Sequence, residues 1–321
     1  MNSILGALVG DAAGATLEFC GCSITEEMAT NAMKMPGGGR IRVGPGQITD
    51  DGELTLTLWR SLNSFDTSHI VPILTLMKGY KDWYESCPFD MGRTCGIAFE
   101  TFYDYFLGRN ITTIQACKDI INNINAHSEA NGALMRATAI ATWIAKNPTA
   151  DIQNGVECAK EDSRLSHPSI VCQEVNAIYV YAIINLLRGK SPVETLHLTT
   201  EFVTNSITSE KVKSWFFNES LDITHLDATK QIGHVRWGFV LAMYFLRNPA
   251  VSYEDAIKIT LMKGGDTDTN AAIVGGLVGA YQSIPEYMLK PVLEFDCTSN
   301  AVRCHIRPAE YSVKRVLADL I

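Results

Sequence analysis

The sequence lacks any cluster of lysine and arginine. Its 321 residues carry 27 basic and 35 acidic side chains, a formal net charge of -8 and a pI near 5.4. A nucleic-acid-binding surface needs grouped cations to neutralise phosphates. We therefore expect no nucleic-acid partner, and an anionic substrate would have to be held by a local site.

Long apolar runs are also scarce. The best candidate, residues 271–281, is glycine-rich and shorter than the roughly 20 residues that a membrane-spanning helix needs. The opening MNSILGALVGDAAG lacks the basic start of a signal peptide and is interrupted by Asp11. We expect a core helix at the N-terminus and no membrane partner.

No pair of cysteines has the C-x-x-C spacing of a metal or redox motif, and the nine cysteines are an odd number. Reduced thiols and a cytoplasmic location fit this pattern best. Cys297, Cys304 and His305 could begin a zinc site, but no fourth ligand lies at a suitable spacing. Buried cysteines that pack as small apolar residues are the preferred interpretation.

The two-residue alternation of strands is rare, whereas apolar residues recur at helical spacing, as in Leu54, Leu58 and Leu62 or Ile178, Ala182 and Leu186. Short polar breaks such as LLRGKSPVE separate these segments. With no internal repeat or shift in composition, we predict an all-α, multi-helix, single domain over residues 1–321, monomeric by default. The longest irregular stretch, roughly 20–48, is expected to be a functional or mobile loop.

Two acidic clusters each precede an apolar helical segment. One is Thr49, Asp50 and Asp51, and the other is GGDTDTN at 264–270. Each could merely cap a helix N-terminus, but each carries more acid than capping needs. If the four aspartates converge, their charge of minus four would suit two divalent cations, and oxygen ligands favour Mg²⁺ or Mn²⁺ over zinc.

The chain resembles the ADP-ribosylglycohydrolase family, which includes dinitrogenase-reductase-activating glycohydrolases and ADP-ribosyl-acceptor hydrolases. The similarity runs in order through nearly the whole sequence. It is carried by GALVGDAAGATLEF, GGGRIRVGPGQITDDGELTL, DMGRT, NGALMR, SHP, GHV, GGDTDTNAAIVGGLVGA and RPAEY. The resemblance implies an all-α fold around a dinuclear Mg²⁺ site. It also implies hydrolysis of the bond between ADP-ribose and an acceptor, with ADP-ribosylated protein or a small ADP-ribosyl conjugate as partner.

The resemblance also implies roles for individual residues. The family's metal ligands correspond to Thr49, Asp50, Asp51, Asp266, Asp268 and Thr269. The positions expected to contact ADP-ribose are Asn131, Gly132, Met135, Arg136, His167 and His234. The catalytic candidates are Glu18, Asp51, Asp268 and Asp90. Two departures are Gly52, where threonine is common, and His234, where an aromatic or aliphatic residue is frequent.

Cleavage at the anomeric carbon passes through an oxocarbenium-like state, so the site must orient the ribose and supply water. Glu18 or a metal-bound aspartate would activate the water, with Asp90 as the second choice. Simpler interpretations remain for three positions: Glu18 as a solvated helix end, His167 as a hydrogen-bonded support, and Arg136 on a solvated face. Asp11 is expected only to hold neighbouring backbone amides.

Competing functions remain open from the sequence. A non-catalytic ADP-ribose-binding or crystallin-like relative would keep the fold and the pocket, and a dinuclear oxygen site could also serve a phosphohydrolase. The glycine run Gly37–Gly39 is not a P-loop, because no strand precedes it and no Lys-Ser/Thr follows it. The acceptor linkage is not readable from the sequence.

Overall fold

The computed structural model describes residues 2–63, 65, 72–299 and 304–318. Over these residues the secondary structure is helical, with no strand and only two isolated bridges, Gly38 to Val43 and Ala130 to His234. The all-α prediction is therefore confirmed. The α-helices of the first half are α1 (Asn2–Gly14), α2 (Glu26–Ala32), α3 (Asp50–Asn63), α4 (Ile73–Glu85), α5 (Arg93–Phe106), α6 (Ile114–Asn125), α7 (Thr138–Ala145) and α8 (Ile152–Arg164).

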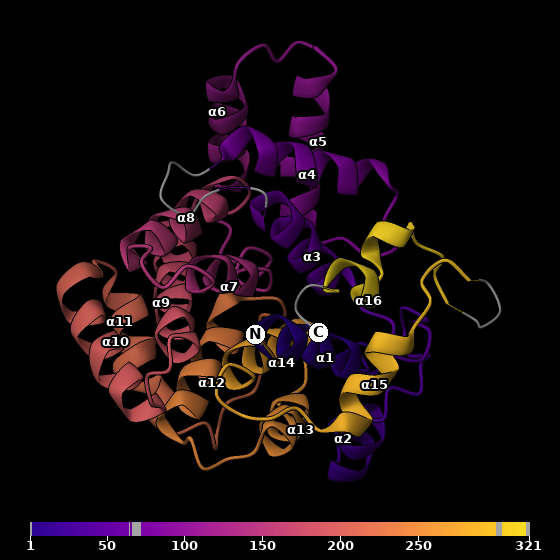
Figure 1. The fold of residues 1–321 in the computed structure, drawn as a ribbon, viewed down its shortest axis with the longest axis vertical. Coiled ribbons are helices and arrows are strands. Elements are labelled where there is room, and N and C mark those ends of the chain that lie inside the picture. The colour runs from indigo at the N-terminus through magenta and orange to yellow at the C-terminus, as the bar shows by residue number, and fades with distance from the viewer. Residues whose placement is uncertain (1, 64, 66–71, 300–303, 319–321) are drawn as a thin grey trace.

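The second half continues in the same way, with two short 3₁₀ segments, η1 and η2. Its elements are α9 (Ile170–Leu187), α10 (Pro192–Ser206), α11 (Glu210–Phe217), η1 (Glu219–Leu221), α12 (Val235–Arg247), α13 (Tyr253–Met262), α14 (Thr267–Val278), α15 (Glu286–Glu294), η2 (Ala309–Tyr311) and α16 (Val313–Val316). Helices α4, α5 and α6 form one end of the molecule, and α2, α13 and α15 lie towards the other (Figure 1).

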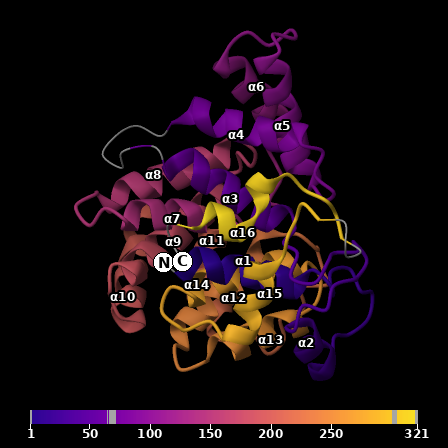
Figure 2. The same cartoon turned by 45° about the vertical axis from the view of Figure 1, so that its right-hand side comes forward.

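The centre of the bundle is the pair α1 and α14, which lie side by side in both views (Figure 1, Figure 2). Glycine lets their backbones touch. A Cβ atom at Gly10 would stand 2.0 Å from the Ala271 carbonyl oxygen, and one at Gly14 would stand 2.4 Å from the Asp268 backbone nitrogen. Any larger residue here would collide with main chain that cannot move aside. This close seam brings the beginning of α14 against the end of α1.

Helix α9 is long and apolar enough to cross a membrane by length and composition alone, so the expectation that residues 271–281 are the best such stretch was wrong. In the fold, 83% of this helix is buried inside the protein. The Tyr179 hydroxyl donates to the Ile273 carbonyl of α14 at 2.6 Å. The apolar surface of α9 therefore packs in the core around α1 and α14.

The predicted irregular stretch 20–48 needs a correction, because it contains α2. The Thr25 hydroxyl accepts from the Met28 amide at 3.2 Å and caps this helix, and two glutamates follow in the first turn. The rest of the stretch is irregular, with positive φ angles of 77°, 95° and 71° at Gly37, Gly38 and Gly39. The long loop therefore consists of a short helix and a glycine turn.

Candidate active site

Asp11 shapes the beginning of α3 from the neighbouring helix α1. Its buried carboxylate accepts from the Thr49 amide at 3.1 and 3.0 Å, from the Gly52 amide at 2.9 Å and from the Thr49 hydroxyl at 2.9 Å. Asp11 thus satisfies free donors of the first turn of α3. This agrees with its expected role and leaves the carboxylates of Asp50 and Asp51 free for another use.

The beginning of α14 is fixed by a different residue. The Thr267 hydroxyl donates to the Gly14 carbonyl at 2.8 Å and ties the helix to the end of α1. Asp266 stands at the N-cap position but makes no side-chain capping bond. Its Oδ2 instead accepts from Asn131 Nδ2 at 2.8 Å. Helix capping therefore does not explain the Asp266 carboxylate.

The two acidic clusters meet in the folded chain. The Thr269 hydroxyl donates to Asp51 Oδ2 at 3.3 Å, across 218 residues of sequence. Carboxylate oxygens lie within 4.8 Å of one another in two buried groups, which are Asp11, Asp51 and Asp268, and Glu18, Asp266 and Asp268. Asp268 belongs to both groups and lies at the centre of the cluster.

Burial and mutual repulsion dominate the electrostatics of this cluster. Desolvation raises the pKa of Glu18 to about 9, helped by the charges of Asp266 and Asp90. The same two causes raise the pKa values of Asp50, Asp51 and Asp268 well above the ordinary range. Asp11 is less affected: burial raises its pKa to about 7, because the Thr49 and Gly52 donors oppose the shift.

The donor set of the cluster fits a hard divalent cation. Glu18 Oε2 and Asp51 Oδ1 are buried without a hydrogen-bond partner among the described residues. Carboxylate and hydroxyl oxygens are the ligands that Mg²⁺ and Mn²⁺ prefer. Because buried carboxylates with free lone pairs are costly without a compensating charge, the residues present suit cation binding.

A cavity of about 520 Å³ opens onto the cluster. Of the predicted site residues, its lining includes Glu18, Asp50, Asp51, Asp90, Asn131, Gly132, Met135, His167, Asp266, Asp268 and Thr269. The loop before α5 supplies Asp90, and burial and the charge of Asp266 raise the pKa of this carboxyl group. The cavity thus combines residues from distant parts of the sequence on one acidic floor.

Three predicted site residues do not line this cavity. Thr49 lies behind Asp51 and donates to Asp11 Oδ1 and Asp51 Oδ2. His234 caps α12 and pairs with Glu129 at 3.0 Å, so it supports the wall through its neighbour Gly233. Arg136 is fully buried beneath the wall, which excludes a solvated face and direct contact with the cavity in this structure.

Several lining residues were missed by the sequence analysis. Phe19 and Ile232 are exposed apolar side chains at the mouth, and both also line a neighbouring cavity of about 1020 Å³. Met91, Gly92 and residues 93–95 continue the wall after Asp90. Phe19 directly follows Glu18, and Met91 directly follows Asp90. Their position next to a predicted acidic residue is the sequence signal that could have identified them, because neighbouring residues extend the same wall.

The zinc alternative finds no support in the geometry. The Cys297 thiol donates to the Pro308 carbonyl, the Cys304 thiol to the Ser299 carbonyl, and His305 Nε2 lies 2.6 Å from the Ile41 carbonyl. Among the described residues, the groups able to hold a metal ion consist of carboxylates. The described cysteines are free thiols, as expected.

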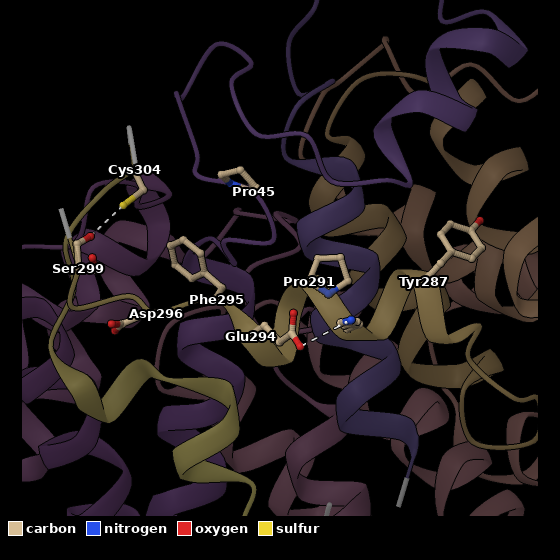
Figure 3. Close-up of a pocket in the computed structure, with 9 residues that line it drawn as sticks. Pro45, Tyr287, Pro291, Glu294, Phe295, Asp296, Ser299 and Cys304 are labelled. Carbon is tan, nitrogen blue, oxygen red and sulfur yellow. Dashed lines mark hydrogen bonds and ion pairs between the residues drawn. The ribbon is translucent and has the colours of Figure 1, made fainter. Parts of the chain in front are cut away.

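A separate cavity of about 560 Å³ lies along α15 and is not a competing active site. Figure 3 shows Pro45, Tyr287, Pro291 and Phe295 around it. Its charged groups are on the rim, where Lys290 and Glu294 pair at 3.9 Å. This cavity contains no group of buried acids.

Fold and site together define an all-helical protein with an acidic cavity at the junction of α1, α3 and α14, whose buried carboxylates could hold a metal ion. The model of the ADP-ribosylglycohydrolase family matches residues 1–314, so the chain belongs to this family. It is a glycohydrolase that acts on the bond between ADP-ribose and an acceptor.

Individual relatives agree with this assignment. The chain is 26% identical to the ADP-ribosyl-dinitrogen reductase glycohydrolase of Rhodospirillum rubrum, over 89% of this chain and 86% of the relative. It is 25% identical to an ADP-ribosylarginine hydrolase of Serratia proteamaculans (strain 568), over 93% and 76%. A solved ADP-ribosylglycohydrolase-related protein complex has the same fold, with a TM-score of 0.68, 20% identity, and coverage of 99% and 98%.

Proposed function

We propose that this protein removes ADP-ribose from modified protein side chains in a Mg²⁺-dependent hydrolysis. The observation that carries the proposal is the buried junction of the two acidic clusters, where Asp51 Oδ1 and Glu18 Oε2 have no partner among the described residues and face a cavity of about 520 Å³. Metal-independent binding of ADP-ribose gives no reason for such a concentration of acid.

The proposed cation ligands are those of the two helix starts, with Asp268 common to both carboxylate groups. Thr49, immediately before α3, joins Asp50 and Asp51 of its first turn, and Asp266, the N-cap residue of α14, joins Asp268 and Thr269 of its first turn. Bound Mg²⁺, as a pair of ions, would supply positive charge that orients the ribose hydroxyls and acidifies water. Mn²⁺ suits the same oxygen donors.

Glu18 is the proposed proton acceptor. Its Oε2 is buried and unpartnered, and it belongs to the same group as Asp266 and Asp268. Cations would lower its raised pKa, because they replace repulsion by attraction. Glu18 Oε2 would then take the proton of the water that attacks the anomeric carbon while the bond from that carbon to the acceptor breaks, and the proton would pass to the departing acceptor atom. Asp90, on another part of the cavity lining, is the second candidate.

A side-chain acceptor fits the open end of the site. Beyond Phe19 the larger neighbouring cavity is lined by Cys20, Cys22 and Arg40, which leaves room for a modified residue and its polypeptide. Support for arginine as the first linkage to test comes from the Serratia relative, which carries the name of an ADP-ribosylarginine hydrolase. Serine-linked conjugates form the comparison.

The test is release of free ADP-ribose from arginine-linked and serine-linked ADP-ribosylated peptides, measured by chromatography with Mg²⁺ or with a chelator. Asp268→Asn should lower the rate by about a thousandfold, on the scale of losing a principal electrostatic group. Asp119→Asn, at an exposed position on α6, is the matched control.

Three outcomes contradict the proposal in different ways. Equal turnover by Asp268→Asn excludes the acidic junction from the reaction. Tight ADP-ribose binding without hydrolysis of either linkage favours the non-catalytic alternative. Production of AMP from ADP-ribose indicates phosphohydrolase chemistry instead.

A further inference from the structure

A buried chain of polar groups runs from α8 to the wall of the active-site cavity. Arg136 is 0% exposed, and its Nε donates to Asp162 Oδ2 at 3.0 Å. Its Nη1 donates to the Gly132 carbonyl at 3.0 Å, and its Cζ lies 4.6 Å from the Tyr80 ring centroid. The guanidinium is therefore fixed in position and fully charged.

The direction of the next hydrogen bonds follows from donor chemistry. Arg136 Nη2 lies 2.9 Å from Ser166 Oγ, and a guanidinium can only donate, so Ser166 Oγ accepts this bond. Ser166 Oγ also lies 2.9 Å from His167 Nδ1. The Ser166 hydroxyl therefore donates its proton in a hydrogen bond to His167 Nδ1.

The opposite arrangement leaves a donor without a partner. If His167 Nδ1 carried the proton, Ser166 Oγ would accept twice and its hydroxyl hydrogen would need another acceptor. Ser166 is 0% exposed, so water cannot supply one. An unsatisfied buried donor is destabilising, so the tautomer with the proton on Nε2 is favoured.

The imidazole of His167 forms part of the cavity wall. The ring is buried and lines the cavity, and Nε2 has no hydrogen-bond partner among the described residues. The absence of a side chain at Gly132 makes the approach possible, because a Cβ there would stand 3.0 Å from Cε1 and 3.3 Å from Nε2. Burial and the charge of Arg136 lower the pKa of His167 to about 3, so the ring is neutral.

We propose that Arg136 and Ser166 are positioning residues that hold His167 as the neutral Nε2–H tautomer, and that this N–H donates to an acceptor oxygen of the bound ADP-ribose. The inference rests on the proposed function for the identity of the ligand. It assigns Arg136 a role through Ser166 and His167 rather than a direct contact.

The neutral Nε2–H group of His167 suits a cavity whose floor is rich in carboxylates. Oxygen acceptors of ADP-ribose, several of them anionic, must enter a cavity rich in carboxylates, so a lone pair on Nε2 would add further repulsion. A charged imidazolium would pair with the nearby acids instead. A neutral N–H avoids both the repulsion and the ion pairing. It also donates its hydrogen bond unchanged over the pH range in which carboxylates bind cations.

The first test uses the free protein and needs no turnover. Two-dimensional ¹H–¹⁵N spectra of the imidazole nitrogens, with His167 assigned by its loss in His167→Gln, should show a protonated Nε2 and an unprotonated Nδ1. Ser166→Ala should convert this into a mixture of tautomers. Ser163→Ala is the matched control, because its hydroxyl donates to the His167 carbonyl at 3.0 Å and does not contact the ring.

The second test is calorimetric binding of ADP-ribose. Ser166→Ala should weaken binding about tenfold, the value of one hydrogen bond, and Ser163→Ala should change it less than threefold. Arg136→Lys, with fewer donors, should act like Ser166→Ala if it folds. A protonated Nδ1 in the free protein, or equal affinity of wild type and Ser166→Ala, overturns the proposal. Absence of hydrolysis overturns only the proposed function.

Discussion

Two environments of buried acids contrast in this protein. In one, the acid has an arginine partner: Arg136 Nε lies 3.0 Å from Asp162 Oδ2, and Arg307 Nε lies 2.8 Å from Glu53 Oε1. On the cavity floor, the carboxylates of Glu18, Asp51 and Asp268 have other carboxylates and hydroxyls as neighbours.

The two environments are close together along one helix. Glu53 follows Asp51 by two residues on α3, and it accepts from Trp83 Nε1 and from both Nε and Nη2 of Arg307, each at 2.8 Å. Arg307 also donates to the Ser86 carbonyl at 2.8 Å, on the chain that leads to Asp90. The paired acid thus supports the framework, while Oδ1 of its neighbour Asp51 has no hydrogen-bond partner among the described residues.

The largest expected effect concerns the paired environment. Arg307→Met should lower the free energy of unfolding by about 3–5 kcal/mol, because it leaves Glu53 buried without its cation. Urea unfolding monitored by circular dichroism measures this loss. In a double-mutant cycle, Glu53→Gln combined with Arg307→Met should cost less than the sum of the two single changes. Strict additivity would show that the pair is not coupled.

The next largest effect concerns the carboxylates of the cavity floor, which lack an arginine partner in the described part of the chain. Mg²⁺ at a hundredfold excess over its dissociation constant should raise the free energy of unfolding by about 2.7 kcal/mol. A chelator should remove this stabilisation. Thermal unfolding with Mg²⁺ and with a chelator measures the change, and Asp51→Asn should reduce it. An identical response of wild type and Asp51→Asn places the ion elsewhere.

The smallest effect is the pH dependence of the ion-free protein. Burial raises the pKa of Asp11 to about 7 from its ordinary 3.8, so the folded state binds this proton more tightly than the unfolded state. The stabilisation is complete below the ordinary pKa and is lost as the pH rises through about 7, which amounts to about 2 kcal/mol between pH 5.5 and 8. The raised pKa of Glu18 acts in the same direction up to about pH 9.

Thermal unfolding in chelator across this range measures the pH effect. Mg²⁺ should reduce the slope, because cations compete with these protons. Stability that increases from pH 5.5 to 8 in chelator would contradict the raised pKa values assigned to these buried carboxyl groups.

Much of the fold could be predicted from local pattern. The spacing of Leu54, Leu58 and Leu62 corresponds to α3, and the apolar N-terminal segment is α1. The pattern predicts a loop where α2 lies, because seven residues give too short a periodicity to detect. The apolar run 271–281 continues past the end of α14 at Val278.

The site was predictable where a residue type carries its own chemical signal. Two acid-rich helix starts suggested convergence, and the structure brings them together through Thr269 and Asp51. The surroundings of Arg136 could not be predicted in the same way. Its partner Asp162 lies 26 residues further along the chain, on α8, and only the packed fold shows whether a cation faces solvent or a buried acid.

The glycine seam between α1 and α14 has a consequence for how such an enzyme can diversify. Because the main chains of these helices touch at Gly10 and Gly14, the spacing between Asp11 and Asp268 is set by backbone contact and is not adjustable by side-chain repacking. The outer walls, built from Phe19, Ile232 and residues 91–95, have no such restriction. A change of the rim can therefore admit a different acceptor while the spacing of the acidic floor stays fixed.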